Sequence, residues 1–383
     1  MKNKFILTLI YIIFFFNSNL LSEENKILKV GLLAPLSGPY GELGNSLIHS
    51  LQLALEEIGN KEIFIIPRDS GFNNKNKLDL AIQDIRTQGV KVIIGPIAHE
   101  EFDLVKKYND LIFISPSNIN PKFTNNIISV GVSLESQLLV LTDFIKKQKK
   151  NKTVIMFPKN KYSKLIEEKL NNLDLKNSRI FKYSSNPEVL TGEIEILTNY
   201  SQRKKSLELR KKMFEDKEDE QSTKELQRLE QLYTLGNVNF DSVIIIDFGN
   251  NLKSVLASLV YTDVDQNKVL FTTINQWFDK SIFYENSIKN LYYPSINYKE
   301  FERYNKNYFK KFNSHPSEIT ILTYDALGLI YYAWKKNGKI ESINDFLFKK
   351  KIKGKIGTFT FKDKKVLQDL TIYKAENNKF IKF

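Results

Sequence analysis

The sequence predicts an α/β protein of two lobes, each built on a doubly wound parallel sheet, with three hinge segments joining the lobes. Three observations support this prediction. From residue 27 onward, short β-prone runs alternate with amphipathic helical segments, an order typical of a doubly wound parallel sheet. The order starts again near residue 134, so two lobes fit better than one large sheet. Turns with glycine, proline and polar residues follow several β-prone runs. In doubly wound sheets, ligands bind in a crevice at these carboxyl ends of the parallel strands.

The first lobe is expected to begin with a strand at Ile27–Leu33, which Pro35 and the glycines after it end. Leucines and an isoleucine then recur at helical spacing from Leu47 to Ile58. The next expected elements, in chain order, are a strand at Ile63–Pro67, a helix at Leu78–Gln88, a strand at Val90–Gly95, a helix at Phe102–Tyr108 and a strand at Leu111–Ser115.

The second lobe is expected to repeat this order. Its expected elements are helices at Leu134–Lys146, Lys161–Asn171 and Leu252–Tyr261 and strands at Thr153–Phe157, Arg179–Tyr183, Phe240–Asp247 and Val269–Thr273. Two further helices are expected at Glu300–Phe312 and Tyr324–Lys335. The tail alternates again at Gly357–Phe361 and Thr371–Lys374, which suggests a closing antiparallel pair.

These elements give the following division of the chain. Residues 1–22 are a signal peptide, 23–133 plus 296–352 form the first lobe, and 134–295 plus 353–383 form the second. The three crossing segments are expected near Gly131–Glu135, Tyr292–Ser295 and Lys353–Phe359.

Residues 201–235 are a charged insertion in the second lobe, dense in Lys, Arg, Glu and Gln and without Gly or Pro. Leu226, Leu229 and Tyr233 fall on one helical face, as do Leu209 and Met213, so we expect a helical hairpin broken near Asp216–Asp219. Such a hairpin is expected to be dispensable for folding. A charge run is more often a solvated surface than a docking site.

The formal net charge is +13, from 57 basic and 44 acidic residues, and only seven of the basic residues are arginine. Lysine lacks the planar fork with which arginine reads base edges. A lysine surplus spread along the chain therefore indicates composition bias, and we expect no nucleic-acid partner. A weak attraction to anionic surfaces stays open.

The N-terminus has the pattern of a secretory signal. Lys2 and Lys4 precede an uncharged, mostly apolar run at Phe5–Phe16, and polar residues follow. We expect cleavage near Ser22, with Glu23 opening the mature chain, and hence a periplasmic location. An uncleaved anchor is the alternative, although the run is shorter than the ~20 residues that a membrane span needs.

The sequence contains no cysteine, which excludes disulfides, thiolate metal sites and the lipid-bearing cysteine of bacterial lipoproteins. No nucleophile elbow and no phosphate-binding P-loop occurs. The three histidines, His49, His99 and His315, are too distant in sequence for an H-x-x-x-H metal pair. A Ser-His-Asp arrangement needs no sequence proximity and stays open, but no motif favours it. We therefore expect a protein without enzymatic activity, cofactor or metal.

Polar residues follow three β-prone runs of the first half of the chain. These loops read PLSGPYG at Pro35–Gly41, GPIAHE at Gly95–Glu100 and SPSN at Ser115–Asn118. Glycine lets a ligand approach the backbone, and the N-terminus of a following helix offers amide donors to an anion. Each loop alone is weak evidence for a binding site, whereas three loops at the same structural position favour one.

The same loops resemble those of type I periplasmic binding proteins, the superfamily of the leucine-binding proteins. LAPLSGPYGELG at Leu33–Gly44 is similar to the opening motif of that superfamily, and Val92–Pro96 to its second strand and turn. ISPSNINP at Ile114–Pro121 resembles a loop of the branched-chain amino-acid receptors. Pro158–Ser163 is similar to the segment that places a cleft tyrosine, here Tyr162, and Ile321–Leu327 to a helix start near the C-terminus. The resemblance implies a two-lobed fold that binds ligands between its lobes.

Within that superfamily the chain most resembles the penicillin-binding protein activators, which regulate peptidoglycan synthesis. IPRDSG at Ile66–Gly71 is similar to the end of their second strand. The charged insertion before FDSVIIIDFG at Phe240–Gly249 lies where that family has one. TINQWFD at Thr273–Asp279 looks like their tryptophan-bearing turn.

The chain departs from the amino-acid receptors at three positions. Ile119 stands where those receptors have a threonine for the α-amino group, Asn275 where they have an acidic residue, and His99 where they have a serine. An ammonium group in a closed cleft needs a counter-charge, and Asp247 is a weak candidate for that role. Capture of a simple amino acid is therefore not expected.

Nine residues are candidates for ligand contact, each with a structural alternative as turn or packing residue. They are Ser37, Tyr40, His99, Ser117, Asn118, Tyr162, Asp247, Asn275 and Trp277. The resemblance implies as partner a small ligand in the interlobe cleft or a peptidoglycan synthase. The alternative function is the substrate-binding component of an ABC importer of the branched-chain amino acid or amide type, which would add a permease as partner.

Overall fold

A computed structural model describes residues 27–119, 126–171, 177–284, 289–355, 357–362, 365–376 and 378–383. The expected signal peptide lies outside these residues. Contacts between residues divide the chain into two compact units. The described residues of unit 1 are 27–116, 126–128 and 323–347, and those of unit 2 fall within 117–119, 129–322 and 348–383. Residues 296–322, placed in the first lobe from the sequence, thus group with unit 2.

Unit 1 is built on a five-stranded sheet in the order β2-β1-β3-β4-β5. Its strands are β1 (Leu28–Ala34), β2 (Ile63–Asp69), β3 (Val92–Ile94), β4 (Ile112–Ser115) and β5 (Ile127–Ser129). The central strand β1 pairs in parallel with both β2 and β3, and β3 pairs in parallel with β4. The order of a doubly wound sheet is therefore confirmed, and the carboxyl ends of β1, β2 and β3 lie at one edge.

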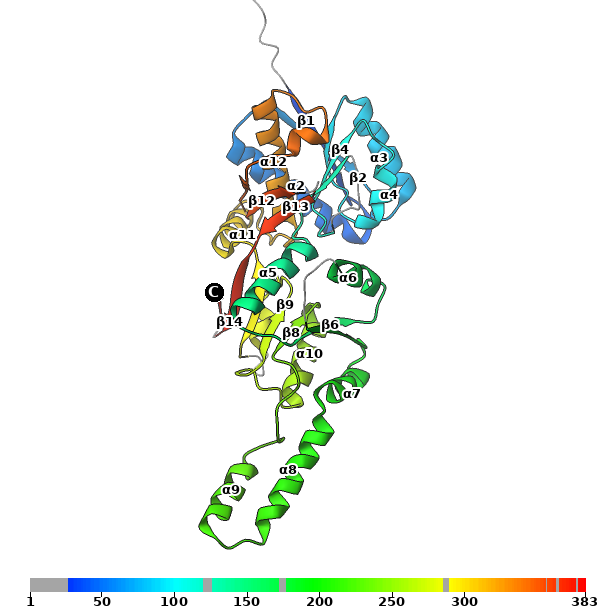
Figure 1. The fold of residues 1–383 in the computed structure, drawn as a ribbon. Helices are drawn as coiled ribbons and strands as arrows, with labels where there is room; N and C mark the ends of the chain where they lie inside the picture. Colours follow the sequence, from blue (N-terminus) through cyan, green and yellow to red (C-terminus); the bar gives the residue numbers. More distant parts are fainter. Residues whose placement is uncertain are drawn as a thin grey trace, which may run out of the picture. The chain divides into compact units, whose positions relative to one another are not determined.

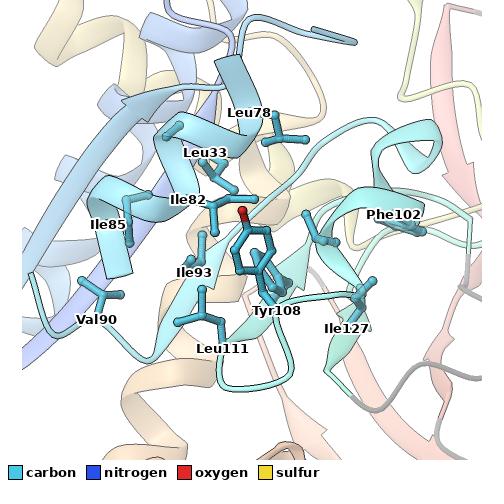
Figure 2. Close-up of a cluster of buried hydrophobic side chains, with 13 residues drawn as sticks. Leu33, Leu78, Ile82, Ile85, Val90, Ile93, Phe102, Tyr108, Leu111 and Ile127 are labelled. Carbon is cyan, nitrogen blue, oxygen red and sulfur yellow. The ribbon is translucent and has the colours of Figure 1, made fainter. Parts of the chain in front are cut away.

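The helices of unit 1 form from the apolar periodicity seen in the sequence. They are α2 (Gly41–Ile58), α3 (Lys75–Thr87), the short α4 (Phe102–Val105) and most of α12 (Thr320–Asn337), with short 3-10 turns at Gly38–Tyr40, His99–Glu101 and Ile343–Phe346. Asn74 caps α3 by accepting a hydrogen bond from the N–H of Lys77. Leu78, Ile82 and Ile85 of α3 are buried against the sheet (Figure 2). Burying each such side chain contributes about 1.5–3 kcal/mol.

Unit 2 is built on a seven-stranded sheet in the order β15-β14-β10-β9-β8-β6-β7. Its strands are β6 (Thr153–Pro158), β7 (Ser178–Tyr183), β8 (Ser242–Ile245), β9 (Leu270–Thr273), β10 (Leu291–Ser295), β14 (Thr371–Glu376) and β15 (Lys379–Lys382). The strands from β7 to β10 are parallel, while β14 and β15 add on antiparallel. Tyr292–Ser295 was expected to be a crossing segment, which is wrong, because these residues lie in β10 within this sheet.

Five helices accompany this sheet: α5 (Leu134–Lys147), α6 (Ser163–Leu170), α7 (Pro187–Thr198), α10 (Gly249–Tyr261) and α11 (Tyr298–Phe312). A 3-10 turn lies at Lys280–Tyr284. Leu138 and Leu141 of α5 pack with Ile155 and Phe157 of β6 and with Ile166 of α6 in one buried cluster. This core holds the ends of β6, β8 and β9, where several candidate residues lie.

The C-terminal tail pairs differently from the expected closing pair. A separate antiparallel sheet contains β11 (Ile352–Lys353), β12 (Thr358–Lys362) and β13 (Lys365–Asp369). The Gly357–Phe361 region pairs with β13, its neighbour across a short connection, and Thr371–Lys374 pairs with β10. The expected pair is therefore wrong. A tight hairpin competes favourably with a more distant partner because it closes a shorter loop.

The insertion forms the expected helical hairpin, which extends away from the sheet of unit 2 (Figure 1). Its helices are α8 (Tyr200–Glu215) and α9 (Glu220–Glu230), and Asp219 caps α9 at the expected break. Leu207 and Leu229 are buried in the hairpin. Leu209 and Met213 share a face as expected, but that face is exposed.

Candidate functional site

Asp69, at the end of β2, fixes the loop that follows β1. Its carboxylate accepts hydrogen bonds from the N–H of Leu36 at 3.0 Å, the N–H of Gly71 at 2.9 Å and the hydroxyl of Ser37. The ammonium group of Lys77 lies 3.3 Å from Asp69 and 3.1 Å from the Ser37 hydroxyl. Partial burial raises the pKa of Asp69, but these hydrogen bonds outweigh it and lower the pKa to about 2. Ser37 thus already has partners within unit 1.

Two glycines allow close packing at the same edge of the sheet. A Cβ on Gly44 would lie 2.2 Å from the carbonyl oxygen of Pro35, and a Cβ on Gly95 would lie 2.7 Å from that of Leu33. Gly95 also has a φ of +113°, a conformation that favours glycine. Of the glycines read from the sequence as ligand approach points, Gly95 therefore serves close packing against β1, whereas a Cβ on Gly38 would meet nothing within 4 Å.

Tyr40 and Phe72 form an exposed aromatic pair near the ends of β1 and β2. Their ring centroids are 4.2 Å apart at an interplanar angle of 37°, and Tyr40 is 46% exposed. Phe72 and Asn73 both have positive φ angles, which turn the chain sharply between β2 and α3. The accessible Tyr40 ring, packed on the partly buried Phe72, offers a ligand an apolar face and one hydroxyl group.

Glu101 is a buried carboxyl group in the 3-10 turn after β3. It accepts a hydrogen bond from the N–H of Asn73 at 2.8 Å and is 5% exposed. Burial raises its pKa to about 7, and the negative charge of Glu100 adds to this increase while the Asn73 bond opposes it. Its neighbour His99 is partly exposed, with Nδ1 3.0 Å from a carboxylate oxygen of Glu100.

Ser117 and Asn118, after β4, group with unit 2. Ser117 is buried, and its Oγ accepts a hydrogen bond from the N–H of Ile119 at 3.2 Å, as in a turn. Asn118 is exposed, and its carbonyl accepts from the N–H of Leu134. Asn118 also borders a cavity of about 20 Å³, which holds about one water molecule.

Tyr162 precedes helix α6 directly after β6, as expected from the sequence. It is 39% exposed, and the ammonium group of Lys161 lies 4.8 Å from its ring centroid. Its N–H donates to the side chain of Asn160 at 2.9 Å. The Tyr162 ring is therefore accessible, with a cation held over one face.

Asp247 is a buried carboxyl group at the end of β8. It accepts hydrogen bonds from the hydroxyl of Tyr183 at 2.7 Å and from the N–H of Phe248 at 2.9 Å. Burial raises the pKa of Asp247, and these hydrogen bonds with one from Asn251 oppose the increase. Burial raises the pKa of Tyr183 as well, and the nearby Asp247 charge adds to that increase.

Asn275 is buried after β9 with its side-chain oxygen fully used. Oδ1 accepts from the hydroxyl of Ser295 at 2.7 Å and from the N–H of Trp277 at 3.0 Å, and its own N–H donates to Gln137 at 2.7 Å. Because a backbone N–H can only donate, it fixes the orientation of the Asn275 amide. Nδ2 is buried and lacks a hydrogen-bond partner among the described residues.

Trp277 and Phe278 turn the chain after β9 with φ angles of 49° and 59°. Trp277 is partly buried, with its ring 6.3 Å from that of Phe301. Phe278 is buried and contacts the rings of Tyr298 and Tyr373 at 4.8 and 5.0 Å. The turn that carries Trp277 is therefore anchored by an aromatic core.

The structure brings the candidates together in two groups, one in each unit. In unit 1, Ser37, Tyr40 and His99 follow the adjacent strands β1 and β3. In unit 2, Tyr162, Asp247 and Asn275 follow the adjacent strands β6, β8 and β9. The side chain of Gln276 donates to the carbonyl of Asp247 at 3.0 Å and so links the last two.

Asp69 and Glu101 escaped the search for site residues. Asp69 lies in the IPRDSG motif at Ile66–Gly71. A carboxylate directly after a β-prone run was the sequence signal that could have identified it as a site residue. Glu101 adjoins the Gly95–Glu100 loop, but no sequence pattern marked it as buried.

Within the described part of the chain, no group of three or more His, Cys, Asp or Glu side chains could hold a metal ion. Among the same residues, no helix is long and apolar enough to cross a membrane.

The fold is that of type I periplasmic binding proteins of the leucine-binding kind, as the sequence motifs indicated. Residues 27–172 match the periplasmic binding protein family model. The family and the similar structures described next are those of binding proteins.

Two solved structures of different biological roles share the fold over nearly the whole chain. LivJ, the branched-chain amino acid transporter substrate-binding protein of Streptococcus pneumoniae, in complex with isoleucine, is 16% identical with a TM-score of 0.56, covering 94% of this chain and 99% of LivJ. The C-domain of LpoA from Haemophilus influenzae, a regulator of PBP1A, is 13% identical with a TM-score of 0.59, covering 93% of this chain and 99% of the domain. At these identities the likeness shows the fold.

A curated relative is similar over a shorter segment. The uncharacterized protein MJ1266 of Methanocaldococcus jannaschii is 32% identical over 115 residues, which is 26% of this chain and 26% of the relative. The chain therefore spans about a quarter of that relative.

Proposed function

We propose that the protein is a non-enzymatic binding protein of the cell envelope that regulates peptidoglycan synthesis by binding a peptidoglycan synthase, in the manner of the penicillin-binding protein activators. The fold of the LpoA C-domain and the charged hairpin before β8 support this proposal. The ligand-contact residues named above remain part of it as candidates.

The observation that carries the proposal is the hydrogen bonding of Asn275. The Asn275 amide offers only its Nδ2 donor, because Ser295 and Trp277 already use Oδ1. The ammonium group of an amino acid is itself a donor, and neither Nδ2 nor the occupied Oδ1 of Asn275 could accept a hydrogen bond from it. The lack of a free hydrogen-bond acceptor on Asn275 therefore favours a partner other than a simple amino acid.

The alternative is the substrate-binding component of an ABC importer, which would add a permease as partner. Asp247 favours it, because Gln276, next to Asn275, donates to the backbone carbonyl of Asp247 at 3.0 Å and so holds this acidic residue near the Asn275 turn. A carboxylate there could supply the counter-charge for an ammonium group. Its burial and its bond to Tyr183 raise the cost of using it for a ligand.

The proposal is tested with a purified bifunctional peptidoglycan synthase from the same organism. We expect direct binding in surface plasmon resonance and a change in the rate of glycan polymerisation or crosslinking on addition of the protein. Absence of both effects, together with submicromolar binding of an amino acid, would favour the importer instead.

Export from the cytoplasm belongs to the same proposal. We expect the protein purified from the native envelope to begin near Glu23, since Lys2, Lys4 and Phe5–Phe16 have the pattern of a cleaved signal. N-terminal sequencing measures this directly. A chain beginning at Met1 in the cytoplasmic fraction would contradict it.

A further inference from the structure

Helix α8 of the insertion carries a surplus of positive charge that its own acidic side chains do not neutralise. It contains six basic and two acidic side chains. Within the described residues, none of its four lysines takes part in an ion pair. Two of the three acidic groups of α9 have partners in their own helix, since Glu220 pairs with Lys224 at 2.5 Å and Glu225 with Arg228 at 2.7 Å.

Two apolar side chains accompany this charge on the solvent side of α8. Leu209 is 55% exposed and Met213 is 58% exposed. Lys205, Leu209 and Met213 are spaced by four residues and Lys212 follows Leu209 by three, so the four share one helix face. We call Lys205, Leu209, Lys212 and Met213 the outer face of α8. Leu207, two residues before Leu209, is buried and lies on the opposite side of the helix.

The outer face is held on a rigid support. Arg203, near the start of α8, is buried and donates to the carbonyl oxygens of Thr262 at 3.0 Å and Asp263 at 2.9 Å. It also donates to the hydroxyl of Thr234 at 2.7 Å, after α9. These bonds fix both ends of the hairpin to the rest of unit 2. A rigid face loses little conformational entropy when a partner binds.

We propose that the outer face of α8 is a docking surface for an acidic, amphipathic segment of a partner protein. Carboxylates of the segment would pair with Lys205 and Lys212, and its apolar side chains would cover Leu209 and Met213. A second copy of this chain fits poorly because its net charge is +13. A lipid surface fits less well, because two apolar side chains present less apolar surface than the single acyl chain that gives only marginal membrane binding.

The proposal deepens the proposed function but does not need the partner to be a synthase, and the test is chosen accordingly. A labelled synthetic helical peptide of glutamate and leucine serves as the probe, and its binding to the full-length protein is measured by fluorescence anisotropy. We expect Lys205→Glu with Lys212→Glu to weaken binding about tenfold. Leu209→Ser with Met213→Ser should weaken it to a similar extent. Circular dichroism checks that each variant folds.

The matched control is Lys299→Glu with Lys306→Glu, which reverses two exposed lysines at the same seven-residue spacing on α11. This control should leave peptide binding unchanged. Equal weakening by the control, or no weakening by either α8 variant, would overturn the proposal. Loss of binding to phosphatidylglycerol vesicles without loss of peptide binding would overturn it in favour of a membrane. Failure of synthase binding with intact peptide binding would contradict only the proposed function.

Discussion

Asp69 and Glu101 lie near the same edge of the unit 1 sheet, yet their pKa values shift in opposite directions. Asp69 has four hydrogen-bond donors around its carboxylate and keeps part of its surface in solvent, so its pKa falls to about 2. Glu101 is buried and accepts a hydrogen bond from one backbone N–H, that of Asn73, so the loss of solvation dominates and its pKa rises to about 7. The number of donors available to the charged form decides the direction.

Replacement of Asp69 by asparagine should destabilise unit 1 at neutral pH. The folded-state pKa of about 2 lies below the ordinary value of 3.8 for an aspartate, so the carboxylate adds stability that is present above about pH 4 and lost as the pH falls toward 2. We expect a loss of about 1–2 kcal/mol at pH 7, allowing for solvent screening. Urea unfolding of Asp69→Asn and of the native protein measures it. The exposed Asp216→Asn serves as control, and a difference that does not narrow below pH 4 would contradict the account.

Replacement of Glu101 by glutamine should stabilise the protein at alkaline pH. The pKa of Glu101 is raised from 4.5 to about 7, so the native state binds more protons than the unfolded state between these values and stability falls as the pH rises through them. Glutamine keeps an acceptor for the N–H of Asn73 without the charge. We expect Glu101→Gln to gain about 1–3 kcal/mol at pH 8 and almost nothing at pH 4.5.

Thermal unfolding across this pH range measures the gain. The exposed Glu208→Gln on α8 should show no such pH-dependent difference. A loss of stability in Glu101→Gln at pH 8 would mean that the charged carboxylate is the favoured partner of the Asn73 loop.

At the scale of elements, periodicity predicted those whose faces are clearly divided. The helices with buried residues at three- and four-residue spacing, such as α3, and the hairpin broken at Asp219 were located within a few residues. Strand β10 was missed because it contains Pro294, which lacks the N–H that a sheet requires. The parallel pairing with β9 involves Leu291 and Tyr292, so Pro294 lies beyond it. The sequence carries no signal for such a local exception.

Arg203 limits how much of the insertion can be removed. The expectation that all of residues 201–235 are dispensable did not include this buried guanidinium, which serves the carbonyls of Thr262 and Asp263. Replacing only residues 208–228 with a Gly/Ser linker should cost less than about 1 kcal/mol, because surface loops tolerate changes in length. Arg203→Met should cost about 2–3 kcal/mol, because it leaves buried carbonyl groups unpaired.

Urea unfolding of the two variants tests this difference. The surface variant Arg210→Met, also on α8 but exposed, controls for loss of a charge. If the linker variant unfolds less cooperatively than Arg203→Met, the distal hairpin belongs to the core of unit 2.

For the whole molecule, sequence motifs located the strand ends but not the hydrogen bonds made there. Ser37, Asp247 and Asn275 were correctly placed after strands, yet each already has partners far away in sequence, namely Asp69, Tyr183 and Ser295. Asp69 and Ser295 come from the neighbouring strands β2 and β10, and Tyr183 comes from β7, two strands away from β8. Only the folded sheet brings these partners together. The type of fold was therefore predictable from the sequence. The hydrogen-bond donors and acceptors that each site residue leaves available to a ligand were not.

The available donors and acceptors lead to a prediction about the whole protein, which should not bind simple amino acids with submicromolar affinity. Asn275 has no free acceptor and Ile119 has no hydroxyl where an ammonium group would need acceptors. An unpaired buried charge costs ~3–5 kcal/mol, or two to four decades in affinity. Calorimetric titration of refolded, ligand-free protein against the twenty amino acids measures it. The double variant Ile119→Thr with Asn275→Asp restores an acceptor pair and should bind a branched-chain amino acid more tightly than the native protein does. Tight binding of any amino acid by the native protein would return the importer to first place, with Asp247 as the counter-charge.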